Sequence, residues 1–206
     1  MIKLEKTDVF GWEAAIRGMR NPMNSWEQSD SGYGHGLELI VGENDLKLMK
    51  SLSKAGSDHG KFLRMINVTV DITAPLYWWK EFDTYKVGTV ANSCSTMHKI
   101  HAKKFTLDDF SHEHLDEWSI TMLERVIEIL NQNREHFIRK PYRKDYWWQM
   151  IQLLPSSYNQ KRTVQLNYQV LKSMYFARKS HKLDEWREFC TWCESLPYFK
   201  EICIGE

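Results

Sequence analysis

The residues that follow Pro155 constrain the fold of this chain most strongly. Proline cannot continue a helix, so one element must end before Pro155 and another must begin after it. Residues 154–186 read L-P-S-S-Y-N-Q-K-R-T-V-Q-L-N-Y-Q-V-L-K-S-M-Y-F-A-R-K-S-H-K-L-D-E-W. We expect a long helix from Ser156 or Ser157 to about Lys179, because serine is a favourable N-cap. Four polar residues interrupt the apolar and aromatic surface of this helix: Asn167, Gln169, Ser173 and Arg178. They predict that one face of the helix lines a polar site.

The clearest strand is predicted over residues 66–72, where apolar and polar side chains alternate. Ala74 and Pro75 end this strand, and Pro75 suits the first position of a helix from Leu76 to about Val87. Apolar stripes and helix breakers predict further helices over residues 43–55, 116–131, 145–154 and 183–195. The first of these has Asn44 as a candidate cap and Gly56 as a stop. Together these elements indicate an α+β fold.

Residues 21–36 differ from the rest of the chain in composition. They contain one proline, three glycines and many serine, asparagine and aspartate residues. This composition predicts a long loop. The glycine-rich residues 31–36 read S-G-Y-G-H-G, but no strand–helix unit of the nucleotide-binding type follows them, which favours a flexible loop.

Length and charge restrict the class of protein. The 206 residues are expected to form a single domain spanning 1–206. A formal net charge of +1 gives no electrostatic footprint for nucleic acid or a membrane surface, so neither is expected as a partner. No apolar run approaches the roughly 20 residues that a membrane span needs. Residues 1–6 lack the apolar segment of a signal peptide, so we expect a cytoplasmic protein.

Two patterns that suggest metal binding also have simpler explanations. Cys190 and Cys193 form a C-x-x-C, which can bind zinc or carry redox chemistry, but the chain holds no second such pair. We therefore expect reduced thiols packed on one helix face, without zinc. The second pattern is a group of histidines that we interpret as ordinary surface or core residues, because no carboxylate or cysteine stands at ligand spacing: His98, His101, His112 and His114.

The segment from Tyr85 to His98 is a candidate binding loop. It reads Y-K-V-G-T-V-A-N-S-C-S-T-M-H, so a short irregular run contains a glycine, an asparagine and several hydroxyl groups. Backbone and side-chain donors in such a run can cradle a phosphate. An ordinary polar connection explains the same composition equally well.

Several segments also match, in order and spacing, the motifs of a known enzyme family. Residues 45–52 (D-L-K-L-M-K-S-L) correspond to a D-x-K-L-I-x-x-L helix, and residues 68–77 (V-T-V-D-I-T-A-P-L-Y) to F-T-F-x-I-x-A-P-I-F. Residues 80–82 (K-E-F) stand at an R-Q-W position, and residues 92–95 (N-S-C-S) at the N-E-x-S of the motif R-H-R-x-x-S-x-N-E-x-S-x-R-Y. The match continues at Leu154, Pro155, Asn167, Arg178, Glu185 and Trp186. The chain thereby resembles the flavin-dependent thymidylate synthases of the ThyX family.

The resemblance implies helices packed on a small antiparallel sheet and a homotetramer with a site at its interfaces. It also implies FAD as cofactor, dUMP or another pyrimidine nucleotide as substrate, and NADPH and methylenetetrahydrofolate as co-substrates. By position in the motifs, Ser95 is the catalytic residue that activates the pyrimidine by hydrogen bonding. The remaining implied positions bind substrate (Arg178 at a base carbonyl, Lys86 at the phosphate, Asn92 and Glu81) or flavin (Asn167, Gln169 and Ser173). Nine tryptophans, more than one core of this size readily hides, also favour an oligomer.

Several motif positions depart from the family pattern. The R-H-R triplet is replaced by a run in which only Lys86 is charged, and Met97 stands at the late arginine. On the C-terminal helix, the family pattern N-x-R-x3-N-x4-R becomes N-x-Q-x3-S-x4-R. Two hypotheses follow: a divergent thymidylate synthase-like enzyme, and a non-catalytic nucleotide-binding protein of the same fold without flavin chemistry. A structural oligomer with no small-molecule site is the third alternative.

Overall fold

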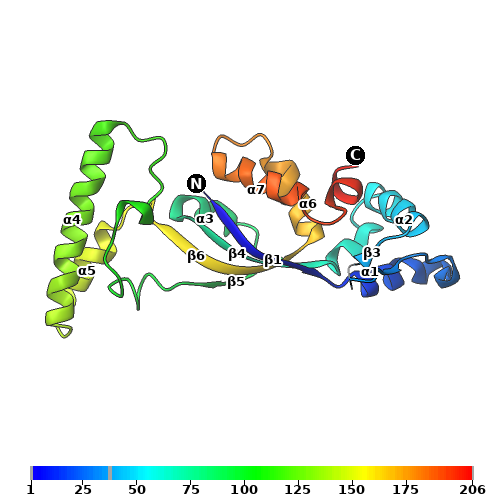
Figure 1. Cartoon of the computed structure of the whole chain (residues 1–206), viewed down its shortest axis with the longest axis horizontal. Coiled ribbons are helices and arrows are strands. Elements are labelled where there is room, and N and C mark those ends of the chain that lie inside the picture. The colour runs from blue at the N-terminus through cyan, green and yellow to red at the C-terminus, as the bar shows by residue number, and fades with distance from the viewer. Residues whose placement is uncertain (1, 37–38, 206) are drawn as a thin grey trace. The chain divides into compact units, whose positions relative to one another are not determined.

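The chain folds into helices packed against a small antiparallel sheet, as the α+β prediction requires (Figure 1). The computed structural model describes residues 2–36 and 39–205. Four strands pair in the order β1-β4-β6-β5, and β2 pairs with β3 in an antiparallel ribbon. The strands are β1 (Lys3–Phe10), β2 (Gly32–Tyr33), β3 (Leu39–Ile40), β4 (Asn67–Pro75), β5 (Val90–Ser93) and β6 (Asn159–Asn167).

Two compact units make up the chain. Unit 1 comprises Met1–Lys3, Ile72–Thr84 and Asn92–Thr163, and unit 2 comprises Leu4–Asp71, Tyr85–Ala91 and Val164–Glu206. The boundary between them therefore falls within all four strands of the larger sheet, β1, β4, β5 and β6. The single domain expected over 1–206 stays a prediction.

Strand β4 confirms the alternation seen in the sequence. The apolar side chains on one face are completely buried, whereas the polar side chains between them are only half-buried. Burying an aliphatic side chain of this size stabilises the fold by roughly 1.5–3 kcal/mol. The buried set is Val68, Val70, Ile72 and Ala74, and Ile66 just before the strand is also fully buried.

The long helix predicted from Ser156 or Ser157 to about Lys179 is wrong in its first half. Asn159–Asn167 forms strand β6, and helix α6 begins only at Tyr168 and ends at Arg178. Within β6, Gln160, Val164 and Leu166 are buried while Gln165 is exposed, which is largely the two-residue period of a strand. The polar side chains at residues 159–163 conceal this period, because they resemble the solvated face of a helix.

The other predicted helices are present with shifted ends. The predicted 76–87 helix stops early, as α3 (Leu76–Phe82), and the predicted 116–131 helix extends further, as α4 (Glu117–Arg139). Three helices match their predictions within two residues: α2 (Glu43–Lys54), α5 (Lys144–Leu153) and α7 (Asp184–Glu194). Strand β1 and helix α1 (Trp12–Arg20) were not predicted. Short turns of 3-10 helix cover Asn21–Met23, Trp26–Gln28, Gly60–Arg64 and Leu107–Asp109, and a π-helical turn covers Lys200–Ile204. None of the described helices has the length and apolar character that a membrane crossing requires.

The apolar side chains of unit 1 include a cluster around α4 and α5 and a group of aromatic rings on α3. Helices α4 and α5 lie side by side (Figure 1) and share a core with the segment before them, formed by Ile100, Phe105, Phe110, Leu123, Ile127, Leu130 and Met150. Helix α3 contributes Trp78, Trp79 and Phe82, whose buried rings contact one another edge-on or tilted. Much of the tryptophan content is therefore core, although Trp118 on α4 is 79% exposed.

The segment predicted as a loop over residues 21–36 is held by one buried carboxylate in unit 2. Asp45 is fully buried, and its Oδ1 accepts a hydrogen bond from Arg20 Nε at 2.6 Å. Its Oδ2 accepts bonds from the hydroxyls of Ser29 and Ser31, each at 2.7 Å, and from two backbone N–H groups. Asn44 was predicted to cap α2, and this prediction is wrong. The Asp30 carboxylate accepts the N–H groups of Asn44 and Asp45 instead.

Asp45→Asn should destabilise the protein by about 3–5 kcal/mol, because the buried Arg20 guanidinium loses its counter-charge. Burial opposes ionisation of Asp45, but hydrogen bonds from Ser31, Ser29 and Arg20 outweigh it and lower its pKa. The stabilisation that ionised Asp45 gives to the folded protein is therefore complete above the ordinary aspartate pKa of about 3.9, and it is lost as the pH falls below that value. Denaturant unfolding from pH 7 to pH 2.5 measures both effects.

The matched control is Asp145→Asn, which breaks an exposed pair with Arg143 and should change the stability far less than Asp45→Asn. Equal destabilisation by the two variants would contradict the anchoring role of Asp45.

Candidate functional site

Arg178, in the last turn of α6, is held by aromatic side chains from two other segments of unit 2. Its Nε donates a hydrogen bond to the hydroxyl of Tyr85 at 2.9 Å. Its guanidinium carbon lies 4.7 Å from the centre of the Trp186 ring and 5.6 Å from that of Tyr85. Cation–π attraction and the hydrogen bond together fix the plane of a half-buried guanidinium. Helix-dipole complementarity alone would not require these contacts.

The loop Tyr85–Ala91 packs closely on the start of α6. Gly88 has a φ of +79°, and a Cβ added there would lie 3.0 Å from Val170 Cγ2 and 3.1 Å from Asn167 Nδ2. The Thr89 hydroxyl donates to the Tyr85 carbonyl and tightens the loop. Lys86 is exposed on this loop, next to the tyrosine that binds Arg178.

The three residues of α6 that the resemblance assigns to flavin have different environments. Asn167 is the N-cap, and its Oδ1 accepts the N–H of Val170 at 3.1 Å. The Ser173 hydroxyl donates to the Gln169 carbonyl at 3.0 Å, which satisfies it within the helix. Gln169 Oε1 is buried and has no hydrogen-bond partner among the residues that the structure describes. Burying such an acceptor without a partner costs about 1–3 kcal/mol, so a ligand donor at this atom would be stabilising.

Ser95, Asn92 and Glu81, the other predicted site residues, belong to unit 1. Ser95 is half-buried in a turn, where its Oγ accepts the N–H groups of Met97 at 3.2 Å and His98 at 2.9 Å. Both bonds use the oxygen as acceptor, so its proton can be donated to a ligand carbonyl. Asn92 is exposed on β5, and Glu81 is half-buried near the end of α3.

The predicted site residues thus fall into two groups. Arg178, Asn167, Gln169 and Ser173 lie on or at the start of α6, and Lys86 lies on the loop packed against that helix. A single site that combines these five with the three residues of unit 1 stays a prediction.

A polar cluster in unit 1 was missed by the sequence interpretation. Gln160 on β6 is buried, and its Nε2 donates to the carbonyl of Cys94 at 2.7 Å, next to Ser95. Arg162 Nε donates to Gln160 Oε1 at 3.0 Å, and its guanidinium carbon lies 4.1 Å from the centre of the Trp79 ring. These side chains therefore position the segment that carries Ser95. The sequence interpretation missed Gln160 and Arg162 because it placed residues 156–179 in a helix. The alternation of buried and exposed positions in β6 is the signal that would have identified them.

The cysteines of the C-x-x-C motif are buried thiols in α7. Burial raises the pKa of Cys190 to about 11 and that of Cys193 well above its ordinary value. Cys203, in the C-terminal turn, is also buried, with its pKa raised to about 12. Thiols of this kind are poor nucleophiles. Among residues 2–36 and 39–205, no group of three or more histidine, cysteine or acidic side chains could hold a metal ion.

The fold described above is similar to that of solved structures of flavin-dependent thymidylate synthases. Thymidylate synthase X from Helicobacter pylori, solved with FAD and dUMP, has a TM-score of 0.70 and 15% identity to this chain. That similarity covers 98% of this chain and 97% of the other. A second structure of the Helicobacter pylori enzyme, also with FAD and dUMP, gives a TM-score of 0.68 at 15% identity over 98% and 99%.

A third similar structure is PolB, a UMP/dUMP methylase from Streptomyces cacaoi bound with 5-Br dUMP. It has a TM-score of 0.64 and 13% identity over 95% of this chain and 89% of PolB. No protein-family model matches the chain, and no curated protein matches it in sequence. Similarity at these identities establishes a shared fold.

Gly88→Ala should destabilise the protein by more than about 1–2 kcal/mol, because alanine is strained at positive φ and its Cβ would press on the start of α6. Two controls separate these effects: Gly56→Ala has a φ of +105° with open space, and Gly32→Ala has open space without positive φ. The expected order of destabilisation in thermal unfolding is Gly88, then Gly56, then Gly32. Equal losses at Gly88 and Gly56 would show that the loop does not pack tightly on α6.

Proposed function

We propose that this protein binds a pyrimidine nucleotide and acts on it by dUMP methylation or a related modification of the base. The observation that carries the proposal is the arrangement of Arg178, whose guanidinium is held by the Tyr85 hydroxyl and the Trp186 ring. An arginine fixed in advance can hydrogen-bond a base carbonyl with little further loss of conformational freedom. The shared fold supports the substrate class, because similar structures contain dUMP or 5-Br dUMP.

The roles of the individual residues follow from their chemistry. Arg178 binds a carbonyl of the base, and Ser95 donates its hydroxyl proton to the pyrimidine and so polarises the ring. Lys86 binds the phosphate with its exposed ammonium. Asn92 and Glu81 complete the proposed substrate contacts.

FAD is proposed as the cofactor, because similar structures contain it and Gln169 offers a buried hydrogen-bond acceptor. The buried Oε1 of Gln169 needs a donor, and a flavin ring carries an imide N–H that can supply one. Asn167 and Ser173 are the other proposed flavin contacts, a neutral amide at the start of α6 and a hydroxyl one turn after Gln169. A bound flavin would supply reducing equivalents to the base, with NADPH and methylenetetrahydrofolate as the proposed co-substrates.

A non-catalytic nucleotide-binding protein is the second candidate function. It is favoured by the neutral side chains of Gln169 and Ser173, since neither can neutralise the pyrophosphate of FAD. Only the flavin-dependent steps would then be lost, while the contacts of Arg178 with a pyrimidine nucleotide would remain.

We also propose a homo-oligomer, most simply a tetramer. Its support is the exposed apolar surface of α4, where Trp118 is 79% and Met122 57% exposed. Large aromatic side chains are enriched at protein interfaces.

Arg178→Ala should weaken dUMP binding by about 10- to 150-fold, or roughly 1.5–3 kcal/mol, because a charge-assisted hydrogen bond is lost. Arg178→Lys should rescue binding poorly, since an ammonium lacks the planar fork. Tyr85→Phe should cause a smaller loss by releasing Nε. Calorimetric titration with dUMP, UMP and dCMP measures these changes.

The matched control is Lys179→Ala, an exposed neighbour whose ammonium lies 5.3 Å from the Phe176 ring centre. It should leave dUMP binding unchanged. Failure of the wild type to bind any of the three nucleotides at millimolar concentration would refute the proposed function.

If FAD is the cofactor, the purified protein should show the flavin absorption band or gain it when FAD is added. Gln169→Leu should then weaken FAD binding by about 2- to 10-fold, because one neutral hydrogen bond is lost. Gln165→Leu, at an exposed position on β6, is the control and should have no effect. Nucleotide binding without any FAD binding would select the non-catalytic alternative.

A further inference from the structure

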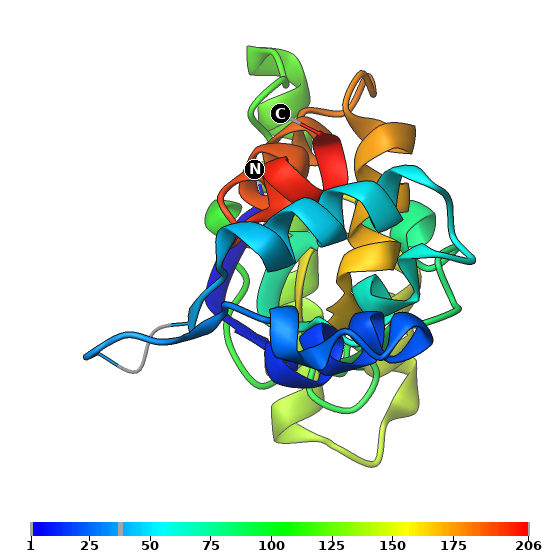
Figure 2. The same ribbon diagram turned by 90° about the vertical axis from the view of Figure 1, so that its right-hand side faces the viewer.

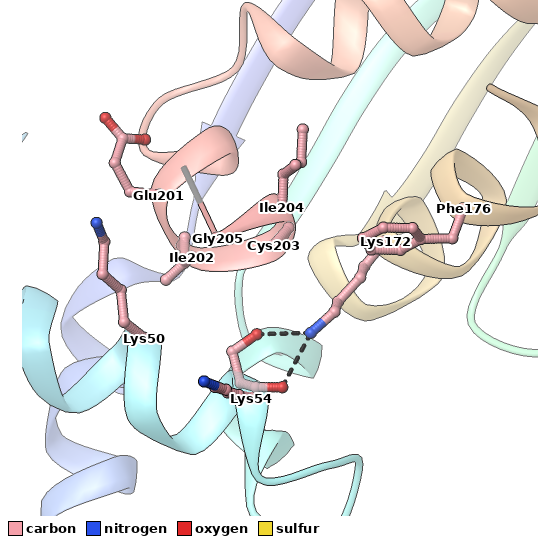
Figure 3. Close-up of a pocket in the computed structure, with 10 residues that line it drawn as sticks. Lys50, Lys54, Lys172, Phe176, Glu201, Ile202, Cys203, Ile204 and Gly205 are labelled. Carbon is pink, nitrogen blue, oxygen red and sulfur yellow. Dashed lines mark hydrogen bonds between the residues drawn. The ribbon is translucent and has the colours of Figure 1, made fainter.

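A basic pocket lies in unit 2 between α2, α6 and the C-terminal turn, three segments that lie side by side (Figure 2). Its volume is about 410 Å³, within the usual range for small-molecule sites. The pocket shares none of its lining residues with the site proposed around Arg178. Figure 3 shows its lining residues, which include Lys50, Ser53, Lys54, Lys172, Phe176 and Glu201.

The lysines on α2 create a concentration of positive charge. Lys50 and Lys54 are one helical turn apart and line the same pocket. Like charges at this spacing destabilise a helix by a few tenths of a kcal/mol. Lys172 adds a third ammonium from α6, and Glu201 supplies a carboxylate among the described lining residues.

Lys172 is held in place by a buried serine. Its Nζ donates to the Ser53 carbonyl at 2.9 Å and to the Ser53 hydroxyl at 2.8 Å, as the dashed lines in Figure 3 show. Ser53 is only 5% exposed, so this anchor is rigid. An ammonium has three donors, and two are directed to Ser53. The third can bind an anion at little cost in side-chain entropy.

An aromatic side chain gives the pocket an apolar wall. Phe176 is 48% exposed, and the Lys179 ammonium lies 5.3 Å from the centre of its ring. Ile204, in the C-terminal turn, extends the apolar lining. A ligand with a flat apolar body can therefore pack on Phe176 while its charged end meets the lysines.

We propose that this pocket binds a small phosphate monoester with a flat, apolar body. Its phosphate would contact Lys172, Lys50 and Lys54, and its body would cover Phe176. Lysine binds phosphate as a compact point charge, which suits a rotating monoester better than a planar carboxylate. The site is independent of the nucleotide contacts proposed for Arg178.

Phenyl phosphate is the probe, compared by calorimetry with inorganic phosphate at constant ionic strength. Phenyl phosphate should bind saturably and more tightly than inorganic phosphate, and Phe176→Ala should abolish the difference. The double variant Lys50→Gln/Lys54→Gln changes two exposed residues, so it should fold normally while weakening binding at least about tenfold. Lys172→Gln should weaken binding similarly.

Lys47→Gln is the matched control, since Lys47 is exposed on α2 but is not a lining residue of this pocket. It should leave the affinity unchanged, as should Arg178→Ala. Absence of saturable binding at millimolar phenyl phosphate would overturn the proposal. So would equal losses from Lys47→Gln and the double variant, or loss of phenyl phosphate binding in Arg178→Ala.

Discussion

The rest of unit 2 depends on the switch from strand to helix at Asn167. Its side chain accepts the N–H of Val170, so β6 ends and α6 begins at one residue. The next residue, Tyr168, is fully buried; its N–H donates to the carbonyl of Ile66, and its hydroxyl donates to that of Pro197. These bonds fix both the axial position and the rotation of α6. They therefore determine what every side chain on that helix can contact.

The fold was predictable where a pattern is local and strong. The apolar alternation of β4 and the apolar stripes of α2 and α7 identified those elements within a few residues. The error at residues 159–167 has a physical cause. Gln160 is a buried polar side chain in that strand, and its Nε2 donates a hydrogen bond to the carbonyl of Cys94, 66 residues away. A polar residue satisfied by tertiary contacts looks, in sequence, like one that faces solvent.

The same limit applies to the candidate site. Arg178 could be singled out from the sequence, because it is a cation on an aromatic surface. Its partner Tyr85 could not, since 93 residues separate the two and the tyrosine stands at a position where the family motif has charge. Likewise, Asp45 fitted a helix motif, but its bonds to residues 29–31 depend on a turn that composition described only as a loop. The local sequence therefore identifies a charged side chain such as Arg178 or Asp45, whereas its hydrogen-bond partners are determined by long-range packing.

Helix α6 directs two cations into two separate environments, and its geometry explains how. Lys172 and Arg178 are six residues apart, which at 3.6 residues per turn separates them by about 120° around the helix axis. One is held by the carbonyl and hydroxyl of Ser53, and the other by the hydroxyl of Tyr85 and the ring of Trp186. To exchange these environments, the whole helix would have to turn about its axis, and that movement would break the cap at Asn167. Substitutions around one of these cations can therefore leave the contacts of the other unchanged, because the two share only the helix backbone.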